Sequence, residues 1–254
     1  MDTRKQRICI LGNSVGFKMR PPRQSAEEKT YGEILSDNGY CVRNISKAGV
    51  MLNEAFASLD DELITWFPDT VIIQFGVVEM CQRQTSRRLN NRLIKNYYLN
   101  MVHGRAYVFD SLFTKVLETL GRIVNGGGRR FVGLVGLRWQ WLSLDRFLSV
   151  LEAVLEHVNK ETGAMTLMVG INPVSPRITR ILPDSGEIIE AANAAMKNLA
   201  ARFPGRVRFL DMKELIGGNM VETTVPDGIH LSAQGHRLLA ERILDELGTR
   251  SLRP

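Results

Sequence analysis

The chain has 254 residues, of which 44% are hydrophobic and 24% charged, and 33 lysines and arginines against 27 aspartates and glutamates give a formal net charge of +6. This is the composition of an ordinary soluble globular protein. No Pro/Ser-rich linker or low-complexity tract divides the chain, which argues against separate domains and predicts one domain over residues 1–254.

The excess positive charge does not indicate a nucleic-acid partner. Basic residues are scattered, and the densest group has no zinc-finger spacing or RNA-binding aromatic motif beside it. We interpret that group as a solvated helix surface: Arg83, Arg87, Arg88, Arg92 and Lys95.

Targeting and cross-linking signals are missing from the sequence. The polar stretch 1–7 leads straight into an apolar segment, with no signal-peptide hydrophobic region and no apolar run of membrane-spanning length. The three cysteines form neither a disulfide framework nor a metal-binding spacing. We therefore expect a cytoplasmic protein with no membrane span and no metal site.

Five β-rich segments follow one another along the chain, at residues 7–11, 40–45, 70–75, 165–171 and 207–211. Two of them, "TVIIQF" and "TLMVGI", are nearly continuous apolar runs, which is typical of strands covered on both faces in a parallel sheet.

Helical patterns lie between and after these segments. They cover residues 25–38, with Ser25 as N-cap, residues 52–66, residues 143–163, with Ser143 and Gly163 as caps, residues 185–205, capped by Ser185, and residues 232–248. The alternation of strand and helix predicts an α/β sandwich around a parallel sheet.

Residues 80–140 are too long for an ordinary connection between a strand and a helix. We predict a helical insertion or cap here, with Gly126–Gly128 as its hinge. Trp139 and Trp141, near its end, could line an acyl or sugar pocket, but we favour packing of the cap against the body. The same surface could join copies of the chain in an oligomer.

The stretch "RICILGNSVGF" carries an apolar strand into a serine between two glycines, Gly12 and Gly16. In an open parallel sheet, ligands bind beyond the carboxyl ends of the strands, where Ser14 would lie. Taken alone, Ser14 could simply cap a helix. A phosphate-binding loop is disfavoured because the stretch matches neither of the two glycine-rich phosphate motifs. The glycines permit close backbone approach or positive φ.

Near the other end, "VPDGIHLSAQGH" places Asp227 three residues before His230, just ahead of the last predicted helix. A carboxylate at this spacing in a Pro/Gly turn can hold the imidazole in one tautomer and stabilise its protonated form. A histidine held in this way can take the proton of a serine hydroxyl. Together with Ser14, the pair indicates nucleophilic catalysis.

Four blocks in chain order resemble the SGNH/GDSL hydrolase superfamily: "ILGNSVG", Gly49 in "NISKAG", "PDTVIIQFGVVE" and "PDGIHLSAQGH". The resemblance implies a flavodoxin-like three-layer α/β/α fold around a five-stranded parallel sheet. It also implies a serine esterase, lipase, thioesterase, carbohydrate deacetylase or O-acyltransferase that needs no metal or organic cofactor.

Carried over to this chain, the resemblance makes Ser14 the nucleophile, His230 the general base and acid, and Asp227 the carboxylate that orients the histidine. The backbone N–H groups of Ser14 and Gly49 would bind the oxyanion.

The chain departs from the family pattern at two positions. Asn13 stands where the family has Asp, and Val78 stands where the Gly-x-Asn-Asp block has the Asn that donates to the oxyanion. Loss of one such donor typically costs ~100- to 1,000-fold in rate. Three explanations are open: the oxyanion hole has fewer donors, catalysis has been lost, or another side chain supplies the missing donor. The candidates for such a donor are Asn13, Asn44 and Asn53.

Further side chains are predicted to bind substrate at the rim. Arg20 and Arg23 follow the nucleophile, and Arg177 follows the fourth strand, so they could frame an anionic substrate unless they are solvated loop residues. Val78 and Glu79 lie in the atypical block "GVVE". Glu79 is either a charge near the site mouth or a residue that favours the start of a helix.

Three functions are compatible with these residues. The first is hydrolysis of an acetyl or longer acyl ester of a small molecule or carbohydrate through an acyl-enzyme. The second is transfer of the acyl group to a sugar or biosynthetic intermediate, which a water-excluding cap would favour. The third is a non-catalytic binding protein on a hydrolase scaffold, suggested by Val78.

Overall fold

A computed structural model describes residues 4–17, 25, 27–81, 140–181, 183–216 and 218–248, without the side chains of residues 177, 180 and 181. The chain divides into two compact units, one formed by residues 1–81 with 142–254 and the other by residues 82–141. The predicted insertion at 80–140 and its glycine hinge, together with the basic group from Arg83 to Lys95, lie almost wholly outside the described residues and stay predictions.

The centre of the larger unit is a five-stranded sheet in which every pair of neighbours is parallel, in the order β2-β1-β3-β4-β5. Its strands are β1 (Arg7–Gly12), β2 (Cys41–Asn44), β3 (Thr70–Gln74), β4 (Met165–Val169) and β5 (Val207–Leu210). β3 is buried along its whole length, as its apolar run predicts. The sequence-based prediction of a five-stranded parallel sheet is confirmed.

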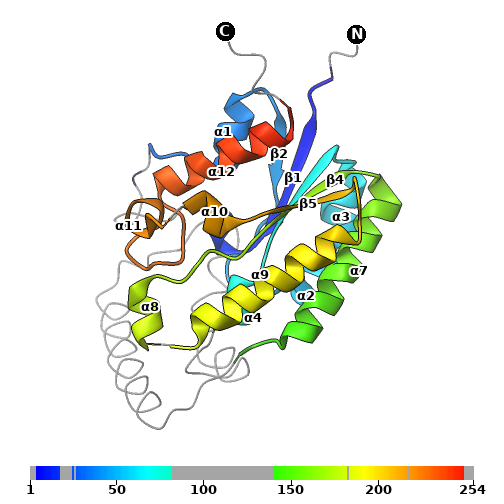
Figure 1. Ribbon diagram of the computed structural model, residues 1–254. Helices are drawn as coiled ribbons and strands as arrows, with labels where there is room; N and C mark the ends of the chain where they lie inside the picture. The colour runs from blue at the N-terminus through cyan, green and yellow to red at the C-terminus, as the bar shows by residue number, and fades with distance from the viewer. Residues whose placement is uncertain are drawn as a thin grey trace, which may run out of the picture. The chain divides into compact units, whose positions relative to one another are not determined.

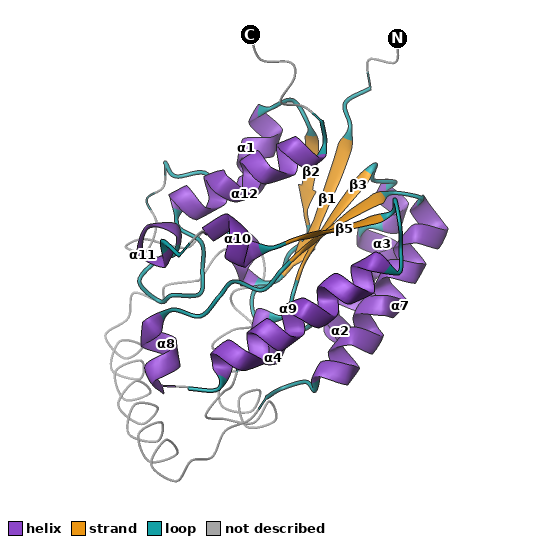
Figure 2. Cartoon of the chain, viewed as in Figure 1, coloured by secondary structure: helices purple, strands orange, loops and turns teal. Residues whose placement is uncertain are grey.

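Helices cover both faces of the sheet (Figure 1). One layer contains α1 (Tyr31–Asp37), α10 (Met212–Ile216) and α12 (Ala233–Glu246), and the other contains α2 (Leu52–Ala55), α3 (Leu59–Glu62), α7 (Leu144–Thr162) and α9 (Ser185–Ala201). Figure 2 shows the strands between these two layers. Fully buried apolar side chains from strands and helices fill the space between them, among them Ile8, Ile10, Leu35, Leu59, Ile72, Phe147 and Leu239.

The longest helices agree with their sequence signals. Ser143 accepts a hydrogen bond from the N–H of Arg146 at the start of α7, and Gly163 ends it at φ 64°. Ser232 caps α12 in the same way. α9 is the exception, because Ser185 is its first residue and the N-cap is Asp184, whose side chain does not cap the helix.

Two helix predictions need correction. α1 begins at Tyr31 rather than near Ser25, because Thr30 and Glu33 form a complete capping box five residues further on. Residues 52–66 are not one helix: α2 and α3 alternate with the 3₁₀ segments η2 (Phe56–Ser58) and η3 (Ile64–Trp66). The hydroxyls of Ser58 and Thr65 donate to carbonyl groups three and four residues earlier, which competes with regular helix.

Short helices that the sequence did not predict follow four of the strands: η1 (Ser14–Gly16), α4 (Val77–Met80), α8 (Pro176–Ile181) and α10. A further one, α11 (Met220–Thr223), follows α10. Within the described ranges, no helix combines the length and apolar character needed to cross a membrane.

His236 joins α12 to α1 inside the core. Its side chain is 0% exposed, and its ring stacks on that of Tyr31 with 5.8 Å between the ring centroids. Its Nδ1 accepts the backbone N–H of Tyr31 at 3.3 Å. Burial lowers the pKa of His236 from 6.5 to about 4. The ring is therefore neutral in the folded protein at ordinary pH, and its protonation would remove the acceptor that Tyr31 uses.

We predict that acid destabilises the protein partly through His236. The folded-state pKa of His236 lies below its unfolded value, so the neutral ring contributes stability that is fully present above pH 6.5. That contribution is lost as the pH falls towards 4, and the free energy of unfolding decreases by up to about 3 kcal/mol. His236→Asn keeps an acceptor near Nδ1 and does not titrate. Urea unfolding at several pH values should show the wild-type chain losing stability relative to this variant below pH 6.5, and a constant difference would contradict the prediction.

Candidate active site

The nucleophile turn begins where β1 ends. The Asn13 side chain accepts the backbone N–H of Val15 at 3.2 Å and caps the short η1 segment, which closes with a bond from Phe17 N to the Ser14 carbonyl. The turn places half-buried Ser14 at the carboxyl end of the central strands. This is the edge at which an open α/β sheet binds its ligands.

Close packing explains the two glycines that flank Ser14. A Cβ on Gly12 would lie 2.9 Å from the Gln74 carbonyl oxygen, and one on Gly16 would lie 3.0 Å from Ser46 Oγ. The Gln74 side chain is fixed in turn, because the hydroxyl of Tyr31 donates to its Oε1 at 3.0 Å. Neither glycine has a positive φ, so glycine is required at these two positions by close packing and not by an unusual backbone conformation.

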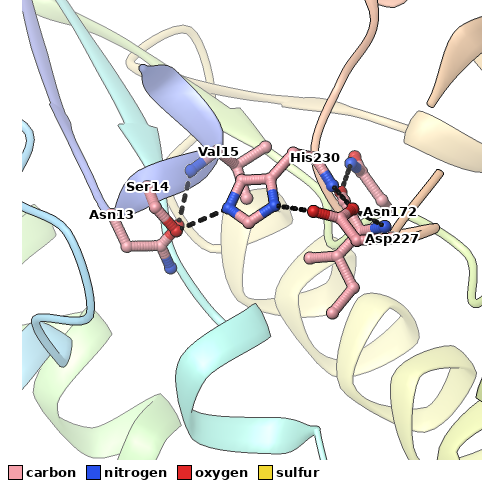
Figure 3. A network of polar contacts seen from close by, with 7 residues as sticks. Asn13, Ser14, Val15, Asn172, Asp227 and His230 are labelled. Atoms are coloured by element: carbon pink, nitrogen blue, oxygen red, sulfur yellow. Dashed lines mark hydrogen bonds and ion pairs between the residues drawn. The ribbon is translucent and has the colours of Figure 1, made fainter. Parts of the chain in front are cut away.

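His230 links Ser14 to Asp227 (Figure 3). Its Nε2 lies 2.9 Å from Ser14 Oγ and its Nδ1 lies 2.8 Å from Asp227 Oδ2. These contacts favour the tautomer in which Nδ1–H donates to the carboxylate and Nε2 accepts the serine hydroxyl. In that arrangement Ser14 can lose its proton to His230 while Asp227 stabilises the resulting positive charge.

The loop that carries the pair is fixed by the same carboxylate. Asp227 Oδ1 accepts the backbone N–H groups of Ile229 and His230, at 2.9 and 3.0 Å. Burial acts to raise the pKa of Asp227, but hydrogen bonds and charge from His230, with the two backbone bonds, hold it at about 2. Asp227 is therefore ionised at every pH at which the protein would be assayed.

Asn172 is a supporting residue that sequence reasoning missed. It follows β4, is 4% exposed, and donates from Nδ2 to the Ile229 carbonyl at 2.9 Å (Figure 3). It thus ties the loop after β4 to the turn between Asp227 and His230. The available signal was an asparagine just beyond a predicted strand, at the edge where Ser14 lies.

The structure separates the three asparagines considered as oxyanion donors. Asn44 is engaged at both ends of its amide, by the Gly16 carbonyl and by Ser46 N. Asn53 is exposed. Asn13 is 1% exposed: its Oδ1 serves as the cap, and its Nδ2 is buried with no hydrogen-bond partner in the described part of the chain. The burial of Nδ2 does not favour Asn13 as an oxyanion donor.

The atypical block forms the start of α4. Val78 is buried and its side chain has no donor, while Glu79 is 0% exposed. Glu79 Oε2 accepts the N–H of Gly76 at 2.9 Å, and Oε1 accepts the N–H of Leu52 at 2.7 Å. The interpretation of Glu79 as a charge at the site mouth is therefore wrong, and the helix-start interpretation agrees with the structure.

The remaining predicted site residues are placed only in part. Gly49 is half-buried in the turn after β2, at φ 68°. Arg20 and Arg23 lie outside the described residues, and Arg177 falls in α8 without a described side chain, so their substrate-binding roles stay predictions. In the described part of the chain, His, Cys, Asp and Glu side chains form no group of three or more that could hold a metal ion.

The packing around the nucleophile turn predicts that Gly16→Ala is destabilising. Its Cβ would press on Ser46 Oγ, and overpacking of this kind costs ~1–3 kcal/mol. Gly186→Ala in α9 is the matched control, because its Cβ would meet one atom at an ordinary 3.8 Å. Urea unfolding should show a loss for Gly16→Ala, no loss for Gly186→Ala, and recovery when Ser46→Ala is added to Gly16→Ala. Equal stability of the two single variants would contradict this account.

Comparison with known proteins identifies a family and a shared fold. Residues 10–238 match the GDSL-like Lipase/Acylhydrolase family, and no curated protein matches the chain. Similar solved structures include a lipase/acylhydrolase from Enterococcus faecalis, with 14% identity, 96% of each chain covered and a TM-score of 0.61.

Two further structures have the same fold. One is a catalytic mutant of an acetylxylan esterase from Geobacillus stearothermophilus, with 13% identity, 98% of this chain and 97% of that chain covered and a TM-score of 0.57. The other is a GDSL-like lipase from Bacteroides thetaiotaomicron, with 14% identity, 96% and 88% covered and a TM-score of 0.57. At these identities the structures show a shared fold, and the family match over residues 10–238 shows that this chain belongs to the GDSL-like lipase/acylhydrolase family, the SGNH hydrolases.

Proposed function

We propose that the protein is a serine esterase that hydrolyses an acetyl or longer acyl ester through an acyl-enzyme on Ser14. The observation that carries the proposal is the continuous hydrogen-bonded series from Ser14 Oγ through His230 to Asp227. Each member has the partner that its role requires.

The reaction proceeds in two halves. Ser14 Oγ attacks the ester carbonyl while His230 Nε2 takes the hydroxyl proton, and Asp227 stabilises the imidazolium. His230 then gives this proton to the leaving alkoxide, and the acyl group stays on Ser14. A water molecule enters, loses a proton to His230 and attacks the acyl-enzyme, after which the acid leaves and Ser14 is reprotonated.

Backbone groups supply the oxyanion site in this proposal. The N–H of Ser14 has no acceptor among the described residues, so it is available to the developing negative charge. We assign the second donor to the N–H of Gly49, in the turn after β2. Val78 supplies none, so the site has one side-chain donor fewer than the family pattern, and we expect modest turnover.

The substrate class we propose is an ester of a carbohydrate or other small alcohol. An acetylxylan esterase is among the proteins that share the fold, and an acetyl group is the smallest acyl group that the chemistry can use. Transfer of the acyl group to an alcohol needs the same first half-reaction, so added alcohol acceptors distinguish transfer from hydrolysis.

Turnover of p-nitrophenyl acetate should depend on each member of the triad. Ser14→Ala and His230→Ala should abolish catalysis by this route. Asp227→Asn should lower kcat by ~10⁴-fold, because an amide cannot hold the productive imidazole tautomer. Steady-state kinetics on the three variants check this, with circular dichroism to confirm folding. Activity that survives in Ser14→Ala and His230→Ala would show that the triad is assigned to the wrong residues.

Substitution of Asn13 distinguishes a cap from an oxyanion donor. Asn13→Asp keeps the oxygen that accepts from Val15 and removes the amide donor, so we expect kcat to stay within about tenfold of wild type. Asn13→Ala removes the cap and should cost ~1 kcal/mol of stability as well as activity. A loss of ~100-fold or more in Asn13→Asp, with the fold intact, would instead identify Nδ2 as an oxyanion donor.

A further inference from the structure

Glu79 is a buried carboxylate for which the proposed reaction has no use. It belongs to α4, yet it bonds to two different segments: Gly76 N, three residues earlier, and Leu52 N, 27 residues earlier. Burial raises the pKa of Glu79 from 4.5 to about 7. Three backbone hydrogen bonds act to lower this pKa, and the nearby Glu54 carboxylate acts to raise it further. A carboxylate kept in such a costly position calls for a specific explanation.

A helix-start role accounts for half of the observed contacts. The bond from Gly76 N to Oε2 is one half of a capping box at the start of α4, and Gly76 has no side chain to form the other half. That role does not account for Oε1, which accepts the first N–H of α2 at 2.7 Å. Glu79 therefore joins the loop after β3 to the start of the helix after β2.

The segment held at Leu52 is the one that contains Gly49. At its other end, Lys47 N donates to the Gly12 carbonyl at 3.0 Å, where β1 passes into the nucleophile turn. Residues 47–52 are thus attached to the Ser14 loop at one end and to Glu79 at the other, with Gly49 between them. If either attachment were lost, residues 47–52, and with them Gly49, could shift relative to Ser14.

We propose that Glu79 is a positioning residue for the oxyanion site, because its carboxylate connects Leu52 to Gly76 and so holds the Gly49 N–H at its distance from Ser14. The inference rests on the proposed function. Since Val78 cannot donate, the site depends more heavily on its backbone donors, and their placement has correspondingly more effect on the rate.

The test compares Glu79→Gln with Glu54→Gln. Glu79→Gln keeps the shape of the side chain but turns an amide N–H₂ towards one of the two backbone N–H groups. Glu54 caps α2, the helix whose first N–H Glu79 accepts, by accepting the N–H of Met51. With p-nitrophenyl acetate, Glu79→Gln should lower kcat by ~100-fold with KM within about threefold, because a donor misplaced by ~1 Å has that effect. Glu54→Gln should leave both parameters within about threefold.

A second measurement needs no variant to fold. In the wild-type protein, the amide hydrogens of Leu52 and Gly76 should exchange slowly with solvent, at rates similar to those of amides within β3. The proposal is overturned if either amide exchanges as fast as an exposed loop amide, if Glu79→Gln folds and retains wild-type kcat, or if Glu79→Gln raises KM without lowering kcat. Absence of esterase activity in the wild-type protein would instead overturn the proposed function, and the exchange rates would still show whether Glu79 makes both bonds.

Discussion

The hydrogen bond between His230 Nε2 and Ser14 Oγ joins residues that lie 216 positions apart in the chain, and the chemistry proposed for this protein depends on it. One partner stands on the turn after β1 and the other on the loop before α12. A bond of 2.9 Å between such distant segments requires both loops to be held rigidly, because a shift of ~1 Å lowers the rate of a general-base reaction about 100-fold. The surrounding structure meets this requirement with buried polar contacts and with glycines.

Each loop is fixed by a different device. The Ser14 turn rests on Gln74 and Ser46, at a separation that excludes side chains at Gly12 and Gly16. The His230 loop is fixed from inside, by the Asp227 carboxylate, which accepts two backbone N–H groups as well as the ring N–H. Asp227 thus orients the proposed catalytic base, His230, and shapes the loop that carries it.

Asn172 and Glu79 add support from loops that carry no reacting group in the proposed mechanism. Asn172 holds the His230 loop from the end of β4, and Glu79 holds the start of α2 from the end of β3. Two buried polar side chains therefore join the loop after β4 to the His230 loop, and the loop after β3 to the segment after β2. In the proposed mechanism this support matters because the side chain of Val78 cannot donate to the oxyanion.

Much of the fold was predictable because its signals are local. The apolar runs of β3 and β4 indicated a parallel sheet covered on both faces, and Ser143 and Gly163 marked both ends of α7. Ser14, Asp227 and His230 were predicted as site residues because the motifs around them are short and specific. That the three side chains meet follows only from the tertiary structure.

The failures concern competing local signals and interactions between distant segments. Ser25 carried a capping pattern, but Thr30 and Glu33 satisfied the helix start more completely. The importance of Glu79 lies in its bond to Leu52, and that of Asn172 in its bond to Ile229, and neither partner is adjacent in the sequence. A local pattern shows which residue can cap a helix, but it does not show which distant backbone group the same side chain reaches.

The most direct test of the central claim is to treat the folded protein with a fluorophosphonate and to locate the adduct by peptide mass spectrometry. Because His230 activates one hydroxyl, the account predicts one adduct per chain, on Ser14, and no adduct when His230 is replaced by alanine. An unlabelled protein, or a label on another residue, would contradict the claim that this hydrogen bond makes Ser14 a nucleophile.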